Sequence, residues 1–249
     1  MPHSRPFVPL TAFASLALAA LFALTAPLAA AERIKASGNV KTETRNVSGF
    51  HSIAIDVPAN VTLRQGTSEG LTLTTDDNIA PLVETVVENG ALKIRWVRKS
   101  LSIETKEIEI VVDAKSIDAL AVRGSGQVRA PTLKAGTLNV AIDGSGEMSL
   151  DALEATSLTV AIHGNGELKS AGRVDTLEAA IAGSGEIHAA KLESRRVQLT
   201  LNGSAQATVW AKDDLTATVA GSGEVSYYGT PRVTQTVAGS GRIAAAKSS

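Results

Sequence analysis

Apolar and polar residues alternate with a period of two along most of residues 118–245, and the pattern repeats around a Gly-Ser-Gly triplet. The first glycines stand at positions 124, 144, 164, 183, 203, 221 and 239, so the repeat advances by 18 to 20 residues. Two positions before them stand Val122, Ile142, Ile162, Ile181, Leu201, Val219 and Val237. Four positions after them stand Val128, Met148, Leu168, Ile187, Ala207, Val225 and Ile243. Because such alternation is typical of strands with one buried face, each repeat predicts a strand on either side of the triplet.

The glycines of the triplets predict sharp corners between these strands. Glycine tolerates positive φ and lets another backbone approach closely. The predicted corner residues are Gly124, Gly126, Gly144, Gly146, Gly164, Gly166, Gly183, Gly185, Gly203, Gly221, Gly223, Gly239 and Gly241. In the fifth copy Ala205 replaces the second glycine. We expect that corner to be distorted or to have a negative φ at Ala205.

A unit of about twenty residues cannot bury its apolar face alone, whereas stacked units bury a continuous core. The constant offsets place like residues over like residues. The sequence therefore predicts an all-β fold, a single-stranded right-handed parallel β-helix in which each copy is one rung. The alternative is an antiparallel meander with hairpins at the triplets, which the constant offsets do not favour.

Residues 32–117 lack the triplet and predict a β-rich N-terminal cap together with the first rungs. A cap protects the end of a solenoid from association with another edge. Expected strands lie at 53–57, 61–65, 71–74, 91–97 and 108–112. One short helix is expected at 79–87, with Asp77 or Asn78 as its cap and Asn89-Gly90 as the turn after it. The repeat region then spans 118–245, and residues 246–249 form a tail.

Residues 1–31 have the pattern of a secretory signal peptide. An apolar run at 10–24 follows Arg5, and Ala29-Ala30-Ala31 fits the cleavage pattern. The run is shorter than the roughly 20 residues of a membrane-spanning helix. We therefore expect cleavage near Ala31 and no membrane span in the mature chain. The alternative is an uncleaved anchor. The expected location is the periplasm, the medium or the cell surface of a Gram-negative bacterium.

The composition limits the kinds of site and partner that the chain can have. The chain has no cysteine, which excludes a disulfide framework and a thiolate metal site. A net charge of -1 gives no strong field to attract nucleic acid. No motif for a cofactor, a metal or an activated nucleophile is present. The partners that remain are a glycan, another envelope protein or further copies of the chain.

Two columns of side chains beside the corners are candidate sites. One position before the glycines stand Arg123, Asp143 and His163, which could act on a sugar by acid–base chemistry, although the column holds a single acid. Three positions after the glycines stand Glu147, Glu167 and Glu186. Stacked carboxylates about 5 Å apart repel one another and could share a cation. The alternative is a solvated edge.

A short basic segment is the third candidate. Lys93, Arg95 and Trp96 could bind an anionic glycan or a lipid headgroup. The alternative is that these charges protect an edge strand against aggregation.

The segment before the repeats carries a resemblance. The Gly-Ser-Gly copies are preceded, in this order, by Gly49-Phe50-His51-Ser52-Ile53 and by residues 61–66, 76–79 and 89–94. Over roughly residues 45–245 the chain resembles the putative auto-transporter adhesin head (GIN domain) family, a family of unknown function. The resemblance implies an exported β-helical domain and brings no catalytic residues with it.

Together these features favour an exported envelope or surface module. Its expected role is non-enzymatic binding or scaffolding through a rigid β-helical face, adhesin-like and with an unknown ligand. One alternative is a polysaccharide-active enzyme on a β-helix. Another is a purely structural periplasmic protein. The low aromatic content, 3%, weighs against both carbohydrate roles, because sugars stack on aromatic rings.

Overall fold

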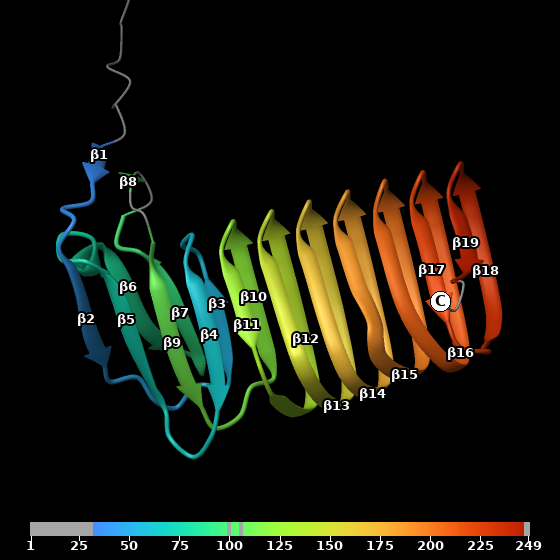
Figure 1. The fold of residues 1–249 in the computed structure, drawn as a ribbon, viewed down its shortest axis with the longest axis horizontal. Helices are drawn as coiled ribbons and strands as arrows, with labels where there is room; N and C mark the ends of the chain where they lie inside the picture. The colour runs from blue at the N-terminus through green and yellow to red at the C-terminus, as the bar shows by residue number, and fades with distance from the viewer. Residues whose placement is uncertain (1–31, 99–100, 105–106, 247–249) are drawn as a thin grey trace, which may run out of the picture. The chain divides into compact units, whose positions relative to one another are not determined.

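The computed structural model describes residues 32–98, 101–104 and 107–246. The predicted signal peptide, residues 1–31, and the last three residues of the tail lie outside them. The part from Glu32 onward is one compact unit. It consists almost entirely of strands (Figure 1), and the described residues include one helical turn, the 3-10 helix η1 at Ala80–Leu82.

The repeat region is a stack of parallel rungs. Every pairing among its strands is parallel, and the first glycines lie side by side from Gly124 to Gly239. This confirms the β-helix and excludes the antiparallel meander. The strands are β10 (Ala119–Gly124), β11 (Gln127–Ala130), β12 (Leu133–Gly144), β13 (Glu147–Gly164), β14 (Glu167–Gly183), β15 (Glu186–Gly203), β16 (Gln206–Gly221), β17 (Glu224–Tyr228), β18 (Arg232–Gly239) and β19 (Arg242–Ala245).

Two layers of strands enclose the core. The residues that lead into each triplet form the pre-corner layer, and those that follow it form the post-corner layer. The long strands β13 to β16 start in the post-corner layer, bend at the far side and end in the pre-corner layer (Figure 1). Inward-facing residues of both layers, such as Ile142 and Leu150, are fully buried. The core is therefore the continuous stack of apolar columns that the alternation predicts.

The two glycines of a triplet meet different steric limits. The first glycines have φ between 90° and 131°. A Cβ atom on Gly164 would lie 2.6 Å from the carbonyl oxygen of Gly144, one rung earlier. The second glycines do not have positive φ, but a Cβ atom on Gly166 would lie 2.4 Å from the Cγ2 atom of Ile142. Backbone bonds fix this close approach, since the N–H group of Asn165 donates to the oxygen of Gly144 at 2.8 Å.

Ala205 fits its corner without distortion. Its φ is not positive, and it is fully buried. The N–H groups of Gln206 and Glu224 donate to Gly185 and Ala205, respectively, at 3.1 and 2.9 Å, as in the other corners. The expected distortion is therefore wrong and the alternative at Ala205 is correct, because the second position of the triplet needs space rather than an unusual backbone.

The N-terminal part continues the stack and then closes it. Strands β3 and β4 lie under β10 and β11, and β7 and β9 lie under β3 and β4, all in parallel. Beyond them the direction reverses. Strand β6 pairs antiparallel with β7, β5 pairs antiparallel with β9, and β2 pairs antiparallel with β5. The strands are β2 (Val40–Arg45), β3 (Ser52–Ile55), β4 (Asn60–Gln65), β5 (Gly70–Asp76), β6 (Val83–Glu88), β7 (Ala91–Trp96) and β9 (Glu109–Ala114). A separate parallel pair consists of β1 (Glu32–Lys35) and β8 (Leu101–Glu104).

The helix expected at 79–87 is wrong over most of its length. Only η1 is helical, and residues 83–88 form strand β6. This segment is rich in valine and threonine, whose β-branched side chains favour strands. Asn89 and Gly90 have φ of 53° and 76° and connect β6 to β7 as a tight hairpin, which is the usual role of an Asn-Gly pair between strands.

No helix among the described residues has the length and apolar character needed to cross a membrane.

The steric limit at the corners predicts a large loss of stability for Gly164→Val. The change strains a backbone with φ of 108° and places side-chain atoms against Gly144. We expect the free energy of unfolding to fall by about 2–5 kcal/mol, and the thermal midpoint by about 5–15 °C. The control is Gly136→Val, because a Cβ atom at Gly136 meets nothing within 4 Å. Equal midpoints for the two variants would contradict the corner model.

A buried hydroxyl predicts a gain of stability. Ser170 is 5% exposed and pairs with Leu150, and its Oγ atom has no hydrogen-bond partner. Ser170→Ala should raise the free energy of unfolding by about 1 kcal/mol, because it removes an unsatisfied polar group. Ser194 is also buried, but its Oγ atom donates to the Leu192 oxygen at 3.2 Å. Ser194→Ala should therefore give no such gain in the same thermal unfolding assay.

Candidate functional site

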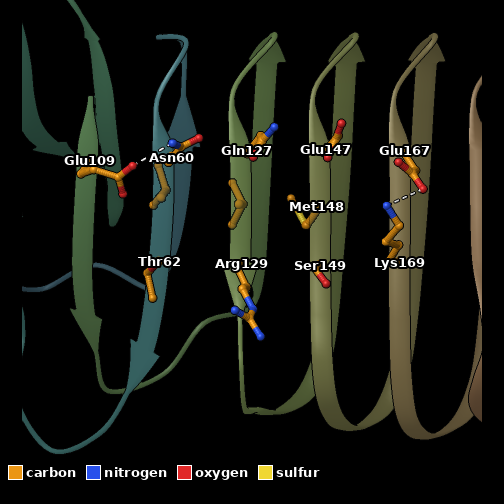
Figure 2. A pocket seen from close by; sticks show the side chains of 12 residues that line it. Asn60, Thr62, Glu109, Gln127, Arg129, Glu147, Met148, Ser149, Glu167 and Lys169 are labelled. Carbon is orange, nitrogen blue, oxygen red and sulfur yellow. Dashed lines mark hydrogen bonds and ion pairs between the residues drawn. The ribbon is translucent and has the colours of Figure 1, made fainter. Parts of the chain in front are cut away.

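The outer face of the post-corner layer presents two columns of polar side chains. The corner column runs in register across the rungs from β9 to β19, and Figure 2 shows its first part. Its residues are Glu109, Asn60, Gln127, Glu147, Glu167, Glu186, Gln206, Glu224 and Arg242. The second column lies two residues further along each strand and contains Thr62, Arg129, Ser149, Lys169, His188 and Thr208. Successive side chains in a column are about 4.8 Å apart, the spacing of paired strands.

Two adjoining hollows follow these columns. One part has a volume of ≈ 320 Å³ and extends over β9, β4, β11, β13 and β14 (Figure 2). The adjoining part, of ≈ 510 Å³, extends over β13 to β16 and is lined by Asp151, His188, Lys191 and Thr208 among others. Ser149 and Lys169 line both parts. We call the two hollows together the polar groove. Its floor consists of paired strands.

Charges of both signs meet in the polar groove. The register places the predicted residues Glu147, Glu167 and Glu186 on consecutive rungs. Lys169 Nζ lies 2.8 Å from Glu167 Oε1. This hydrogen bond raises the pKa of Lys169, and the negative charges of Glu147 and Glu186 act in the same direction. His188 Nε2 lies 3.0 Å from Glu186 Oε2 and 3.2 Å from Glu167 Oε1.

Asp151 lies at the edge of the groove between two donors. The Ser149 hydroxyl donates to Asp151 Oδ1 at 2.7 Å, and Arg129 Nε donates to Oδ2 at 2.7 Å. These bonds stabilise the carboxylate, so they hold the pKa of Asp151 below its ordinary value, the Ser149 bond more strongly. Arg129 also lines the groove, and its side chain is 68% exposed.

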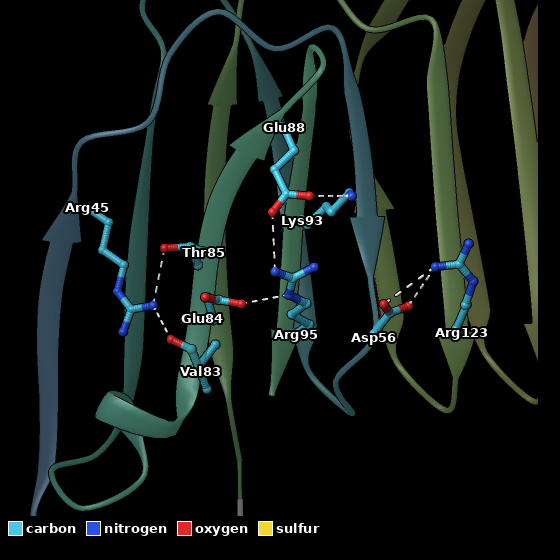
Figure 3. A network of polar contacts seen from close by, with 9 residues as sticks. All are labelled: Arg45, Asp56, Val83, Glu84, Thr85, Glu88, Lys93, Arg95 and Arg123. Atoms are coloured by element: carbon cyan, nitrogen blue, oxygen red, sulfur yellow. Dashed lines mark hydrogen bonds and ion pairs between the residues drawn. The ribbon is translucent and has the colours of Figure 1, made fainter. Parts of the chain in front are cut away.

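The predicted trio Arg123, Asp143 and His163 lies on the outer face of the pre-corner layer. Asp143 Oδ1 lies 3.0 Å from His163 Nδ1, and Asp143 Oδ2 lies 3.8 Å from Arg123 Nε. Arg123 also contacts Asp56 Oδ1 at 3.1 Å, so a fourth residue joins the trio (Figure 3). Asp56 could not be predicted from the triplets, because it belongs to the cap, where no triplet sets the alignment. The signal that could have found it is the match of Ser52–Ile55 with the strand before Gly124.

The predicted basic segment lies on β7 and is balanced by β6 (Figure 3). Lys93 Nζ lies 2.6 Å from Glu88 Oε2, and Arg95 Nε lies 2.6 Å from Glu84 Oε2. The bond from Lys93 lowers the pKa of Glu88, and the bond to Glu84 raises that of Arg95. Trp96 packs against the core. The two glutamates offset the positive charge that an anion site would need, and β7 is not an edge strand, because it pairs with both β3 and β6.

Comparisons with known proteins identify a family and solved structures with a similar fold. A family model described as "Putative auto-transporter adhesin, head GIN domain" matches residues 49–231. No curated protein matches the chain. A putative adhesin from Bacteroides fragilis, 24% identical, matches with a TM-score of 0.80 over 86% of this chain and 100% of that one.

Two structures from Parabacteroides distasonis are also similar. One is a putative adhesin, 22% identical, with a TM-score of 0.72 over 86% of this chain and 100% of that one. The other is described as a putative lipid-binding protein and is 26% identical, with a TM-score of 0.72 over 87% of this chain and 100% of that one.

The contacts of Asp151 predict a pH-dependent contribution to stability. Its pKa is lower in the folded than in the unfolded chain, so the contribution is present above the unfolded pKa and is lost as the pH falls through the folded pKa. We expect Asp151→Asn to lower the free energy of unfolding at neutral pH by less than about 1 kcal/mol. Urea denaturation should show that this difference disappears in acid. Asp175→Asn, at an exposed position of β14, is the control, and a pH-independent difference for Asp151→Asn would contradict the assignment.

Proposed function

Because the chain belongs to the putative auto-transporter adhesin head (GIN domain) family, we propose that it is an exported, non-enzymatic binding module that uses the polar groove. The observation that carries this proposal is that the two hollows of the groove lie side by side along the stack and share Ser149 and Lys169. Its lining side chains are spaced by the strand pairing rather than by loops. Such a surface is already arranged for an elongated ligand, so binding does not require ordering of the groove itself.

The chemistry of the lining favours a protein partner over a glycan. Gln127, Ser149 and Thr208 offer hydrogen bonds. Arg129 and Lys169 add positive charge in the column beside the glutamates. None of the described residues that line the groove is Phe, Tyr or Trp, whereas sugar-binding surfaces commonly use stacking on these rings. We therefore infer an extended segment of another envelope protein, carrying charges of both signs, as the ligand.

Catalysis has less support than binding. Stacked carboxylates about 5 Å apart match the spacing of the acid pair in retaining glycosidases. However, Glu167 is already engaged by Lys169 and His188. Glu147 and Gln127 are exposed, so water has free access to this part of the groove. A hydrolytic site gains from excluding water and from walls that orient the sugar, and the groove offers neither.

Lipid binding, suggested by the description of one similar structure, also has less support here. A further hollow, of ≈ 630 Å³, lies beside the exposed Val40. Four acidic residues line it, namely Asp76, Glu104, Glu107 and Glu109. Anionic headgroups bind to basic clusters rather than to acidic ones, so this hollow does not suit them.

Site-specific crosslinking in the bacterium tests the proposal. A photoreactive amino acid at position 149 lies in the middle of the groove, and one at position 200 lies on the outer face of the pre-corner layer. We expect a discrete crosslinked product with an envelope protein from position 149 and none from position 200. Lys169→Glu should reduce the product at least severalfold, because it reverses a charge in the groove. The same product from both positions, or no product from position 149, would contradict a binding role for the groove.

A further inference from the structure

Three side chains of types that bind metals converge beside the polar groove from two consecutive rungs. Glu167 comes from β14, whereas Glu186 and His188 come from β15. One carboxylate oxygen of each glutamate and one ring nitrogen of His188 all lie within 4.8 Å of one another. The register explains the convergence, since Glu167 pairs with Glu186 and residues two apart on a strand share a face.

We propose that Glu167, Glu186 and His188 form a binding site for one divalent transition-metal ion of the Zn²⁺ type. The site is independent of the proposed protein ligand, since it would hold a metal whether or not the groove binds a partner.

The separations of the donor atoms fit this class of metal. His188 Nε2 lies 3.0 Å from Glu186 Oε2 and 3.2 Å from Glu167 Oε1. Ligand atoms at about 2.0–2.2 Å from a tetrahedral Zn²⁺ are roughly 3.3–3.5 Å apart. The two nitrogen–oxygen separations therefore need to open by only a few tenths of an ångström, while the two carboxylate oxygens already lie within 4.8 Å of each other, and water would complete the coordination.

The donor set also selects the metal. One imidazole nitrogen with two carboxylate oxygens suits Zn²⁺ and neighbouring transition metals. Ca²⁺ and Mg²⁺ prefer shells made of oxygen alone. The metal needs the lone pair of Nε2, so it binds neutral His188 with its proton on Nδ1 and displaces any proton held between Nε2 and the carboxylates.

Lys169 would compete with a metal ion for Glu167. Its ammonium group contacts Glu167 Oε1, the same oxygen that faces His188. The Lys169 side chain is 55% exposed, so it can turn away when a metal arrives. Removal of its charge should therefore tighten metal binding, without changing any ligand.

The convergence is specific to this pair of rungs. One rung earlier, the position of His188 is taken by Lys169, and one rung later by Thr208. The carboxylate column predicted from the sequence, Glu147, Glu167 and Glu186, includes two of the ligands but not the histidine. Glu147 provides a matched control, because it lies in the same column and is outside the converging set.

Titration calorimetry with Zn²⁺ alone tests the proposal, using tag-free protein of residues 32–249, which includes the whole compact unit. We expect one Zn²⁺ per chain. His188→Gln should weaken binding at least about tenfold, since loss even of a supporting group costs about 10–100-fold. Glu147→Gln should change the affinity less than about threefold by charge alone, and Lys169→Gln should increase it.

Two further measurements separate a built site from general attraction to acidic groups. Ca²⁺ should bind at least about tenfold more weakly than Zn²⁺, because the ring nitrogen disfavours it. Co²⁺ should give a visible absorption spectrum that His188→Gln abolishes while the thermal midpoint stays unchanged. Equal loss of Zn²⁺ affinity in Glu147→Gln and His188→Gln, equal affinity for Ca²⁺ and Zn²⁺, or no saturable Zn²⁺ binding would each overturn the proposal.

Discussion

The structure depends on the absence of a Cβ atom where the backbone of one rung crosses that of the next. At Gly183 and Gly203 such an atom would lie 2.4 Å from a carbonyl oxygen of the preceding corner. Overlap with backbone cannot be relieved by a change of rotamer, so any side chain would separate the rungs. The glycines thus hold one edge of the stack in strict alignment, and the hydrogen bonds between rungs follow from that alignment.

Strict alignment makes the surface of the protein a set of columns. Side chains at the same position of neighbouring rungs lie closer together than side chains on the same face of one strand. Many of the charge contacts therefore run along the stack. Asp56, Arg123, Asp143 and His163 alternate in this way across four rungs. The contact of His188 with Glu167 belongs to the same class. Outward positions are spared the steric limits of the core, so they can carry recognition while the inward positions carry stability.

Much of this arrangement could be predicted from the sequence, and the exceptions have physical causes. The triplets predict the alignment of the rungs, and therefore the columns that contain Glu147 and Asp143. The strands expected at 53–57, 61–65, 71–74, 91–97 and 108–112 correspond to β3, β4, β5, β7 and β9, whereas β2 was not expected. The places of these strands in the stack could not be predicted, because no Gly-Ser-Gly triplet marks them. The helix expected at 79–87 fails over residues 83–87, because their pairing with β7, a contact outside the segment, decides their conformation. The grouping of His188 with the glutamates was not predicted, because one of its partners, Glu167, lies twenty-one residues earlier on the neighbouring rung.

Unequal rung lengths leave the corners undisturbed. The irregularities in strand pairing lie after Leu150, Lys169 and Ala189, toward the far bend rather than at the triplets. The bend therefore absorbs a missing or additional residue before the chain reaches the next glycine. Insertions and deletions at that side would leave the pattern of outward side chains beside the corners unchanged. Such a chain could grow or shrink over evolutionary time by whole coils while preserving the surface it shows to its surroundings.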